Sequence, residues 1–84
     1  MKRQVLILAS GPLNPSGDTL IFKALAPFVH EVIDKQRIDI AGHTIVAVLI
    51  LCDPAHIPAI LEDLRIAMNP HNFDIALEEL EVSE

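Results

Sequence analysis

Two segments of the chain are almost continuously apolar over the length of a β-strand. They are residues 4–10 and 44–51, and the first is followed at once by Gly11 and Pro12. A short apolar run bounded by turn residues is typical of a strand with aliphatic side chains on both of its faces. We therefore predict two strands that are buried on both faces.

Two further segments alternate between apolar and polar residues. In residues 31–40 the isoleucines and the charged side chains take opposite faces, and in residues 73–79 Phe73, Ile75 and Leu77 share one face. Alternation with a period of two indicates strands with one buried face. Their polar character favours positions at the edges of a sheet.

A first helix is predicted after the turn-rich segment 11–18. Asp18 or Thr19 is expected to cap its start, because both side chains can accept a hydrogen bond from a free backbone N–H. Pro27 removes a backbone donor, so the helix is expected to end near Ala26.

A second helix is predicted between the apolar run 44–51 and Asn69-Pro70. Either Asp53 caps a distorted first turn, or Pro58 occupies the first helical position. Four side chains at helical spacing are expected to face the core: Ile57, Leu61, Leu64 and Met68.

The resulting element order is βαββαβ, which is the ferredoxin-like α+β arrangement: a four-stranded antiparallel sheet with two helices on one face. In this fold the first and third strands are central, and these are the two continuous apolar runs. The order predicts a single domain over residues 1–84, with a core of residues 4–80 and a frayed tail of residues 81–84.

Helices on one face of the sheet leave the other face open. Because the two central strands carry aliphatic side chains on both faces, such as Val5 with Leu6 and Val48 with Leu49, the open face is expected to associate. A second copy, or the rest of a longer protein, is predicted to cover it.

Composition and charge exclude several classes of partner. The chain has 84 residues, is 51% hydrophobic but only 4% aromatic, and carries a formal charge of −6. An acidic chain without a basic patch is expected to bind no nucleic acid, and its strands lack the aromatic side chains on which RNA-binding modules stack bases. The single Cys52 fits a reducing compartment. No apolar run approaches the roughly 20 residues that span a bilayer, so we expect no membrane partner and a cytoplasmic location.

The motifs of enzymes on this architecture are missing from the sequence. The first loop has no arginine for a phosphate, no Cys-x-x-Cys pair follows the first strand, and the four histidines stand thirteen or more residues apart. We therefore expect no catalytic residue, no metal and no cofactor.

The segment 11–18 is the one candidate binding site. It combines glycines and short polar side chains with a helix N-terminus, whose free N–H groups suit a carboxylate or a phosphate. Turn and cap chemistry accounts for the same residue types, so both interpretations stand at this point.

The chain resembles an ACT domain, the small regulatory module that binds amino acids in enzymes of amino-acid metabolism. It is most similar to the N-terminal ACT domains of phosphoserine phosphatases, which share a G-x-D-x-P-G loop, a leucine-rich helix end, a strand with a Gln and a Gly hairpin. The resemblance covers Val5 to Glu79, and the matching stretches are residues 9–16, 20–26, 33–36, 40–42 and 73–76. The family's Gly and Pro are Gly11 and Pro15 here, whereas its Asp is Leu13 and its second Gly is Ser16.

The resemblance implies a regulatory amino-acid-binding or dimerisation module of a serine-biosynthesis enzyme, with no catalysis of its own. A small amino acid such as serine would lie between the loop and the second strand of a neighbouring copy. The implied partners are a second copy in a homodimer or a C-terminal catalytic domain, and that phosphatase domain would use Mg²⁺. The implied ligand-binding residues are Gly11, Asn14, Pro15, Ser16, Gly17, Asp18, Asp34 and Gln36.

Two alternatives remain. One is a purely structural oligomerisation domain without a ligand, which Leu13 and Ser16 favour because the loop loses a polar group. The other is a stand-alone ACT-type regulator.

Overall fold

The computed structural model describes residues 2–80. Along the chain lie β1 (Arg3–Pro12), α1 (Gly17–Leu25), β2 (His30–Ile40), β3 (His43–Cys52), the short 3₁₀ turn η1 (Pro54–His56), α2 (Ile57–Met68), a second turn η2 (Asn69–His71) and β4 (Asp74–Leu80). The predicted tail of residues 81–84 lies outside the described residues.

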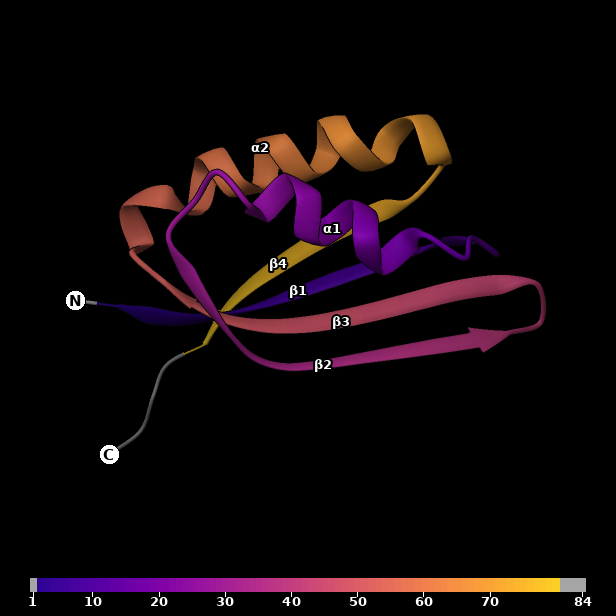
Figure 1. Ribbon diagram of the computed structural model, residues 1–84, viewed down its shortest axis with the longest axis horizontal. Helices are drawn as coiled ribbons and strands as arrows, with labels where there is room; N and C mark the ends of the chain where they lie inside the picture. Colours follow the sequence, from indigo (N-terminus) through magenta and orange to yellow (C-terminus); the bar gives the residue numbers. More distant parts are fainter. Residues whose placement is uncertain (1, 81–84) are drawn as a thin grey trace.

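The four strands form one antiparallel sheet in the order β2-β3-β1-β4. Figure 1 shows α1 and α2 on the same face of this sheet. The predicted ferredoxin-like α+β fold is confirmed, and so are the central positions of the two apolar strands and the edge positions of the two amphipathic ones.

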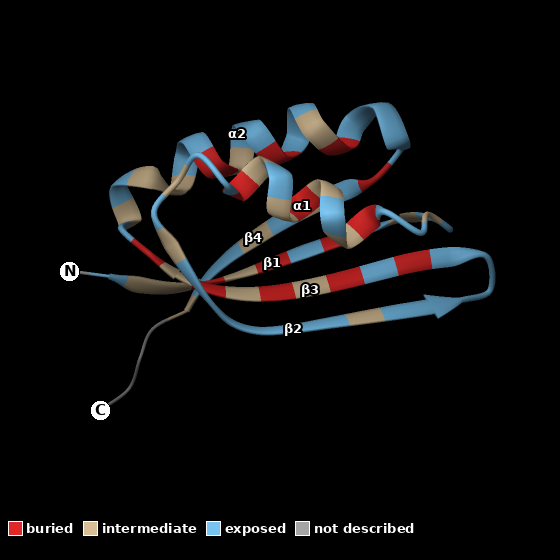
Figure 2. Cartoon of the chain, viewed as in Figure 1, coloured by how far each residue is buried: buried red, intermediate tan, exposed pale blue. Residues whose placement is uncertain are grey.

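The core lies between the sheet and the two helices. Buried residues alternate with more exposed ones along β1 and β3, and α1 and α2 each contribute buried residues (Figure 2). The buried apolar side chains are Val5, Ile7, Ala9, Ile21, Leu25, Val46, Val48, Ile50, Cys52, Ile60, Leu64, Met68 and Phe73. Burying an aliphatic side chain contributes roughly 1.5–3 kcal/mol, so this layer supplies most of the driving force for folding.

The prediction that β1 and β3 are buried on both faces is wrong for the single chain. Leu8 is 39% exposed and Ile45 is 38% exposed, because no helix covers the side of the sheet to which they point. The sequence pattern shows that both faces of these strands are aliphatic. It does not show that only one of the two faces is covered by helices.

Strand β1 extends beyond its predicted end at Ser10. It continues to Pro12, which pairs with His43 of β3. The partner on the other side, β4, begins only at Asp74 opposite Ser10. One side of β1 is therefore free beyond that point, and proline is tolerated where no ladder hydrogen bond is required.

Helix α1 begins two or three residues earlier than predicted. Its N-cap is Ser16, which makes no side-chain cap hydrogen bond, so neither Asp18 nor Thr19 is the cap. The helix ends at Leu25, one residue before the predicted Ala26.

Both predicted starts of the second helix are found in part. Asp53 accepts a hydrogen bond from the backbone N–H of Ala55 and so caps η1. Helix α2 begins at Ile57, with Pro58 in its first turn, where a backbone donor is not needed.

The buried stripe of α2 differs from the prediction at one position. Ile60 is 1% exposed, whereas Leu61 is only half-buried. Both residues fit the helical spacing with Leu64 and Met68, and the rotation of the helix against α1 and β4 decides between them.

This rotation is testable. Ile60→Ala is expected to lower the free energy of unfolding by about 2–5 kcal/mol, the usual cost of a cavity at a fully buried aliphatic site. Leu61→Ala is the matched control and should cost less than half as much, because its side chain still contacts water. Urea unfolding followed by circular dichroism measures both, and equal losses would contradict the observed orientation of α2.

Candidate functional site

The loop of residues 13–16 between β1 and α1 is tied to the β2–β3 hairpin by backbone hydrogen bonds. The N–H of Leu13 donates to the carbonyl of Gly42 over 2.9 Å. The N–H of Asn14 donates to Oγ1 of Thr44, also over 2.9 Å. The loop is therefore held in one position relative to the sheet.

Arg37 of β2 also holds this loop in place, through hydrogen bonds to its backbone carbonyls. Its Nη1 donates to the carbonyl of Pro15 and to Oδ1 of Asp18, both over 3.0 Å. Its Nη2 donates to the carbonyl of Asn14 over 2.5 Å, and its Nε donates to Oδ1 of Asp39 over 3.2 Å. One guanidinium thus joins the loop, the first turn of α1 and the edge strand, a task for which its fixed fork of donors is suited.

The alternation of β2 explains why this arginine lies under the loop. Arg37 pairs with Val46, whose side chain is buried on the helix side of the sheet. Lys35, Arg37 and Asp39 therefore face the helices, and Nζ of Lys35 lies 5.2 Å from the centroid of the Phe22 ring. Ile38 and Ile40 consequently point to the open face.

Thr44 connects Asp39 to the loop. Its hydroxyl donates to Oδ1 of Asp39 over 2.9 Å while accepting from the N–H of Asn14. Thr44 is fully buried, so both hydrogen bonds are needed to offset the cost of removing its hydroxyl from water.

The charge balance of this cluster is negative. Arg37 stands against the carboxylates of Asp18 and Asp39, with the loop carbonyls adding further negative dipoles. The Arg37 side chain is only 24% exposed, so its positive charge is largely shielded from an incoming anion. The cluster favours a cationic group, such as an ammonium, over a carboxylate or phosphate.

The backbone donors at the start of α1 are partly used within the loop. The N–H of Ser16 donates to Oδ1 of Asn14 over 2.9 Å, and the N–H of Thr19 donates to Oδ1 of Asp18 over 3.1 Å. This agrees with the turn-and-cap interpretation of the segment and reduces its capacity to bind an anion.

The predicted ligand-binding residues fall into two groups. The loop group is brought together at one end of the sheet: Gly11, Asn14, Pro15, Ser16, Gly17 and Asp18. Asp34 and Gln36 pair with Leu49 and Ala47 and lie on the opposite, open face. A single chain therefore does not join the two groups.

The two glycines of the loop group allow close packing. A Cβ on Gly11 would come within 2.7 Å of the Phe73 ring, and one on Gly17 within 3.3 Å of the Thr44 side chain. Both glycines thus have a structural role in this chain.

Asp34 and Gln36 line a shallow hollow of about 210 Å³ on the open face. Its floor consists of Leu6, Ala47 and Leu49. The hollow combines an aliphatic floor with one carboxylate, one amide and Lys35 in its lining.

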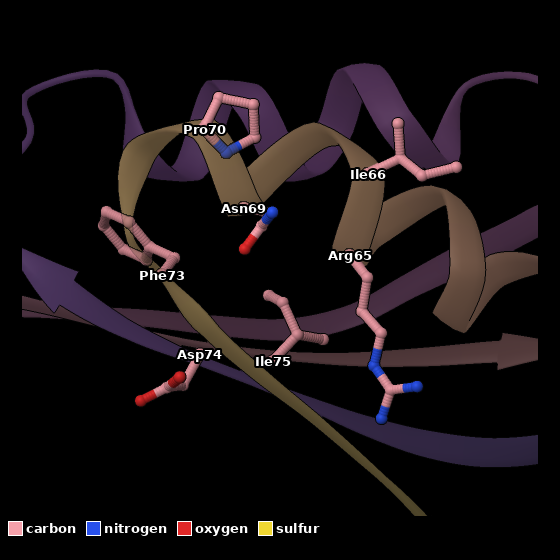
Figure 3. A pocket seen from close by; sticks show the side chains of 7 residues that line it. All are labelled: Arg65, Ile66, Asn69, Pro70, Phe73, Asp74 and Ile75. Carbon is pink, nitrogen blue, oxygen red and sulfur yellow. The ribbon is translucent and has the colours of Figure 1, made fainter.

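A wider hollow of about 670 Å³ lies between the end of α2 and β4. In Figure 3 the side chains of Arg65 and Asp74 lie on either side of Ile75. None of the predicted ligand-binding residues lines it, and Ile66 on its margin is 66% exposed.

The one cysteine of the sequence is not placed as an accessible thiol. Cys52 is fully buried at the end of β3. Burial raises the pKa of its thiol, and the carboxylates of Asp53 and Glu79 raise it further. Within residues 2–80 no three His, Cys, Asp or Glu side chains are grouped to hold a metal ion, and no described helix is long and apolar enough to cross a membrane.

Sequence reasoning missed three residues of the loop cluster: Arg37, Asp39 and Thr44. It placed Arg37 and Asp39 on the polar face of an edge strand but not under the loop. The one available signal was the alternation of isoleucines with charged residues along this strand. That alternation does not decide which of the two rows faces the helices.

Comparisons with known proteins identify the fold. No family model matches the chain, and no curated protein is similar to it in sequence. Among solved structures, it superposes on a putative glycine cleavage system transcriptional repressor with a TM-score of 0.86 at 14% identity, over 100% of this chain and 49% of that one.

Two further structures are similar. An ACT domain protein from Streptococcus pneumoniae matches with a TM-score of 0.78 at 9% identity, over 92% of this chain and 89% of that one. A formyltetrahydrofolate deformylase from Burkholderia mallei matches with a TM-score of 0.83 at 11% identity, over 92% of this chain and 28% of that one. The chain has the fold of an ACT domain, and it spans about half of the repressor and about a quarter of the deformylase.

The Arg37 cluster is expected to contribute to stability. Arg37→Met keeps the aliphatic stem but removes the guanidinium, and should lower the free energy of unfolding by about 1–3 kcal/mol because charged and carbonyl groups lose their donor. Arg65→Met is the control, since Arg65 is exposed on α2 and its side chain makes no hydrogen bond or ion pair with another described residue. Urea unfolding measures the free energy of unfolding of both variants. Equal losses would contradict the structural role of the cluster.

Cys52 is expected to be unreactive in the folded protein. At pH 8 a thiol reagent such as dithiobis(nitrobenzoate) should label it at least about 100-fold more slowly than in urea, because the thiol is buried and its pKa is raised. The raised pKa also means that this group's contribution to stability is present at neutral pH and is lost as the pH rises toward the folded pKa. Rapid native labelling would contradict the burial of Cys52.

Proposed function

We propose that the chain is a non-catalytic regulatory module of the ACT type that binds a small amino acid at the loop between β1 and α1. The observation that carries this proposal is the rigid, acidic cluster around Arg37 on an ACT fold. A site fixed before the ligand arrives loses little conformational entropy on binding.

Free polar groups at the loop match the ends of an amino acid. The Oγ of Ser16 and the Nδ2 of Asn14 donate no hydrogen bond to any described residue, so both are available for the carboxylate of a ligand. The carboxylates of Asp18 and Asp39 exceed the charge of Arg37, and this excess suits an ammonium group. The predicted ligand, serine, carries both ends.

The proposed site needs a second copy. Asp34 and Gln36 lie on the face of β2 away from the loop of their own chain, so they reach a ligand only from a neighbour. The partner in this proposal is therefore a second copy of the chain. The homodimer places the edge strand β2 of one copy beside the loop of the other.

The identity of the parent enzyme is a finer proposal. The loop and hairpin motifs support an N-terminal module of a phosphoserine phosphatase, whose C-terminal domain would use Mg²⁺. The solved structures carry other names, so this proposal rests on the sequence motifs alone.

A structural module without a ligand is the second candidate. It is favoured by a specific observation: Arg37 already satisfies the loop carbonyls and both carboxylates, and Leu13 is 57% exposed where the family has an Asp. The stand-alone regulator remains a third possibility, which the similar putative transcriptional repressor supports.

Calorimetric titration with a panel of amino acids, including serine, distinguishes the first candidate from the second. We expect saturable binding at or below millimolar concentration, accompanied by a shift toward dimer in sedimentation. Ser16→Ala should weaken binding about fivefold, the effect of one lost hydrogen bond of ~1 kcal/mol.

Ser10→Ala is the matched control, because Ser10 is exposed on β1 and is outside the proposed site. It should leave affinity unchanged. No heat from any amino acid at millimolar concentration would reject the ligand site and leave the structural module.

A further inference from the structure

We infer that the open face of the sheet binds an amphipathic helix of a partner protein, whose apolar stripe is flanked by Lys or Arg on both sides. This inference goes beyond the proposed amino-acid site, which lies at the loop and the edge strand β2. It follows from how apolar and acidic residues are distributed across the four strands.

The centre of the open face is an aliphatic stripe. It runs along the two middle strands β1 and β3, and consists of Leu6, Leu8, Ile45, Ala47 and Leu49. Each of these side chains is half-buried or exposed in the chain. The stripe is continuous because successive pairs of the β1–β3 ladder, such as Leu6 with Leu49 and Leu8 with Ala47, lie side by side.

Carboxylates flank this stripe on both sides. Glu31 and Asp34 lie on the β2 edge, and Asp74 and Glu78 lie on the β4 edge. All four are exposed.

No lysine or arginine of the paired strands lies on the open face to balance the charge of these four carboxylates. The arginines and lysine of the described strands occupy positions that face the helices: Arg3 opposite Cys52, Lys35 opposite Val48 and Arg37 opposite Val46. The open face is therefore acidic along β4 and along the half of β2 that carries Glu31 and Asp34, whereas Ile38 and Ile40 continue the apolar surface over the other half of β2.

The spacing of the two acidic edges fits one helix. Three strand spacings of about 4.8 Å separate β2 from β4, which gives about 14 Å between the edges. An α-helix with its side chains is about 10–12 Å wide, so a single helix along β1 and β3 would place its flanking side chains over the carboxylates.

Two hollows on the face suit long basic side chains. The hollow of about 210 Å³ has an aliphatic floor, and its other lining residues are Lys35 together with Asp34 and Gln36, which also belong to the proposed amino-acid site. A second hollow, of about 360 Å³, has Leu8, Ile45 and Ala76 in its floor and Asp74 at its rim. Lys and Arg bury their aliphatic stems on apolar surface while keeping the charge at its edge, and each hollow offers both environments.

Charge argues against the other occupants of this face. When two copies stack with aligned strands, like charges meet in either orientation: Asp34 lies over Glu78 where β2 covers β4, and the carboxylates of the two β4 strands face each other where β4 covers β4. Like charges across an interface disfavour that pairing. The anionic surface of a membrane is disfavoured for the same reason.

The test is a fluorescence-anisotropy titration of the full chain with a labelled 18-residue helical peptide that has a leucine stripe flanked by lysines. A matched peptide with glutamates in place of the lysines is the specificity control. We expect micromolar binding of the lysine peptide that weakens at least tenfold between 50 and 500 mM salt, and at least tenfold weaker binding of the glutamate peptide.

Two variants locate the binding surface. The double variant Asp74→Lys with Glu78→Lys should abolish the preference between the peptides, because two lysines on β4 then balance Glu31 and Asp34 on β2, and neither changed residue belongs to the proposed amino-acid site. Leu8→Glu should abolish binding, whereas Ile66→Glu, an equivalent change on the exposed side of α2, should not alter it. Circular dichroism confirms that each variant is folded, and the charge reversal decides the question if Leu8→Glu unfolds.

Three results would overturn the inference. They are no binding of the lysine peptide at 1 mM, equal binding of both peptides, or conversion of a dimer to a monomer by Leu8→Glu in sedimentation. The last result would show that a second copy occupies the face. Serine binding is measured separately, so failure of the peptide titration leaves the proposed amino-acid site untouched.

Discussion

Two helices cover one face of a four-stranded sheet, while the two central strands carry aliphatic side chains on both faces. One covering layer therefore buries only one of the two apolar faces. The position of the core and the exposure of the open face both follow from this. On the covered side, Val5, Ile7, Val48 and Ile50 are fully buried. On the other side, Leu8 and Ile45 remain in contact with water. A small domain has little stability to spare. The partner helix proposed above would cover this exposed surface.

The edge strand β2 reverses the usual distribution of polar and apolar residues, and this reversal creates the candidate site. Lys35, Arg37 and Asp39 face the helices, where Arg37 holds the loop carbonyls and two carboxylates. Ile38 and Ile40 face the open side, where they extend the aliphatic surface. The same alternation therefore builds a polar cluster at the loop and an apolar face on the other side of the sheet.

Periodicity and turn chemistry were sufficient to predict the element order, the strand positions and the fold. They could not decide between residues that satisfy the same spacing, such as Ile60 and Leu61, because the rotation of a helix depends on the surface against which it packs. They also could not show which row of β2 faces the helices, so Arg37 was not recognised as the centre of the loop cluster. The resemblance alone assigns Gly11 and Ser16 to ligand binding, and the structure adds that Gly11 packs against Phe73 and that Ser16 is the N-cap of α1.

The uncovered sheet face is the central claim, and methyl NMR in the presence of a neutral paramagnetic gadolinium chelate measures it directly. At micromolar protein concentration the methyl groups of Leu8 and Ile45 should relax strongly, while those of Ile7 and Val48 on the opposite face should be protected. Equal protection of all four residues would contradict the account, because it would show that both faces of the sheet are already covered in the isolated protein.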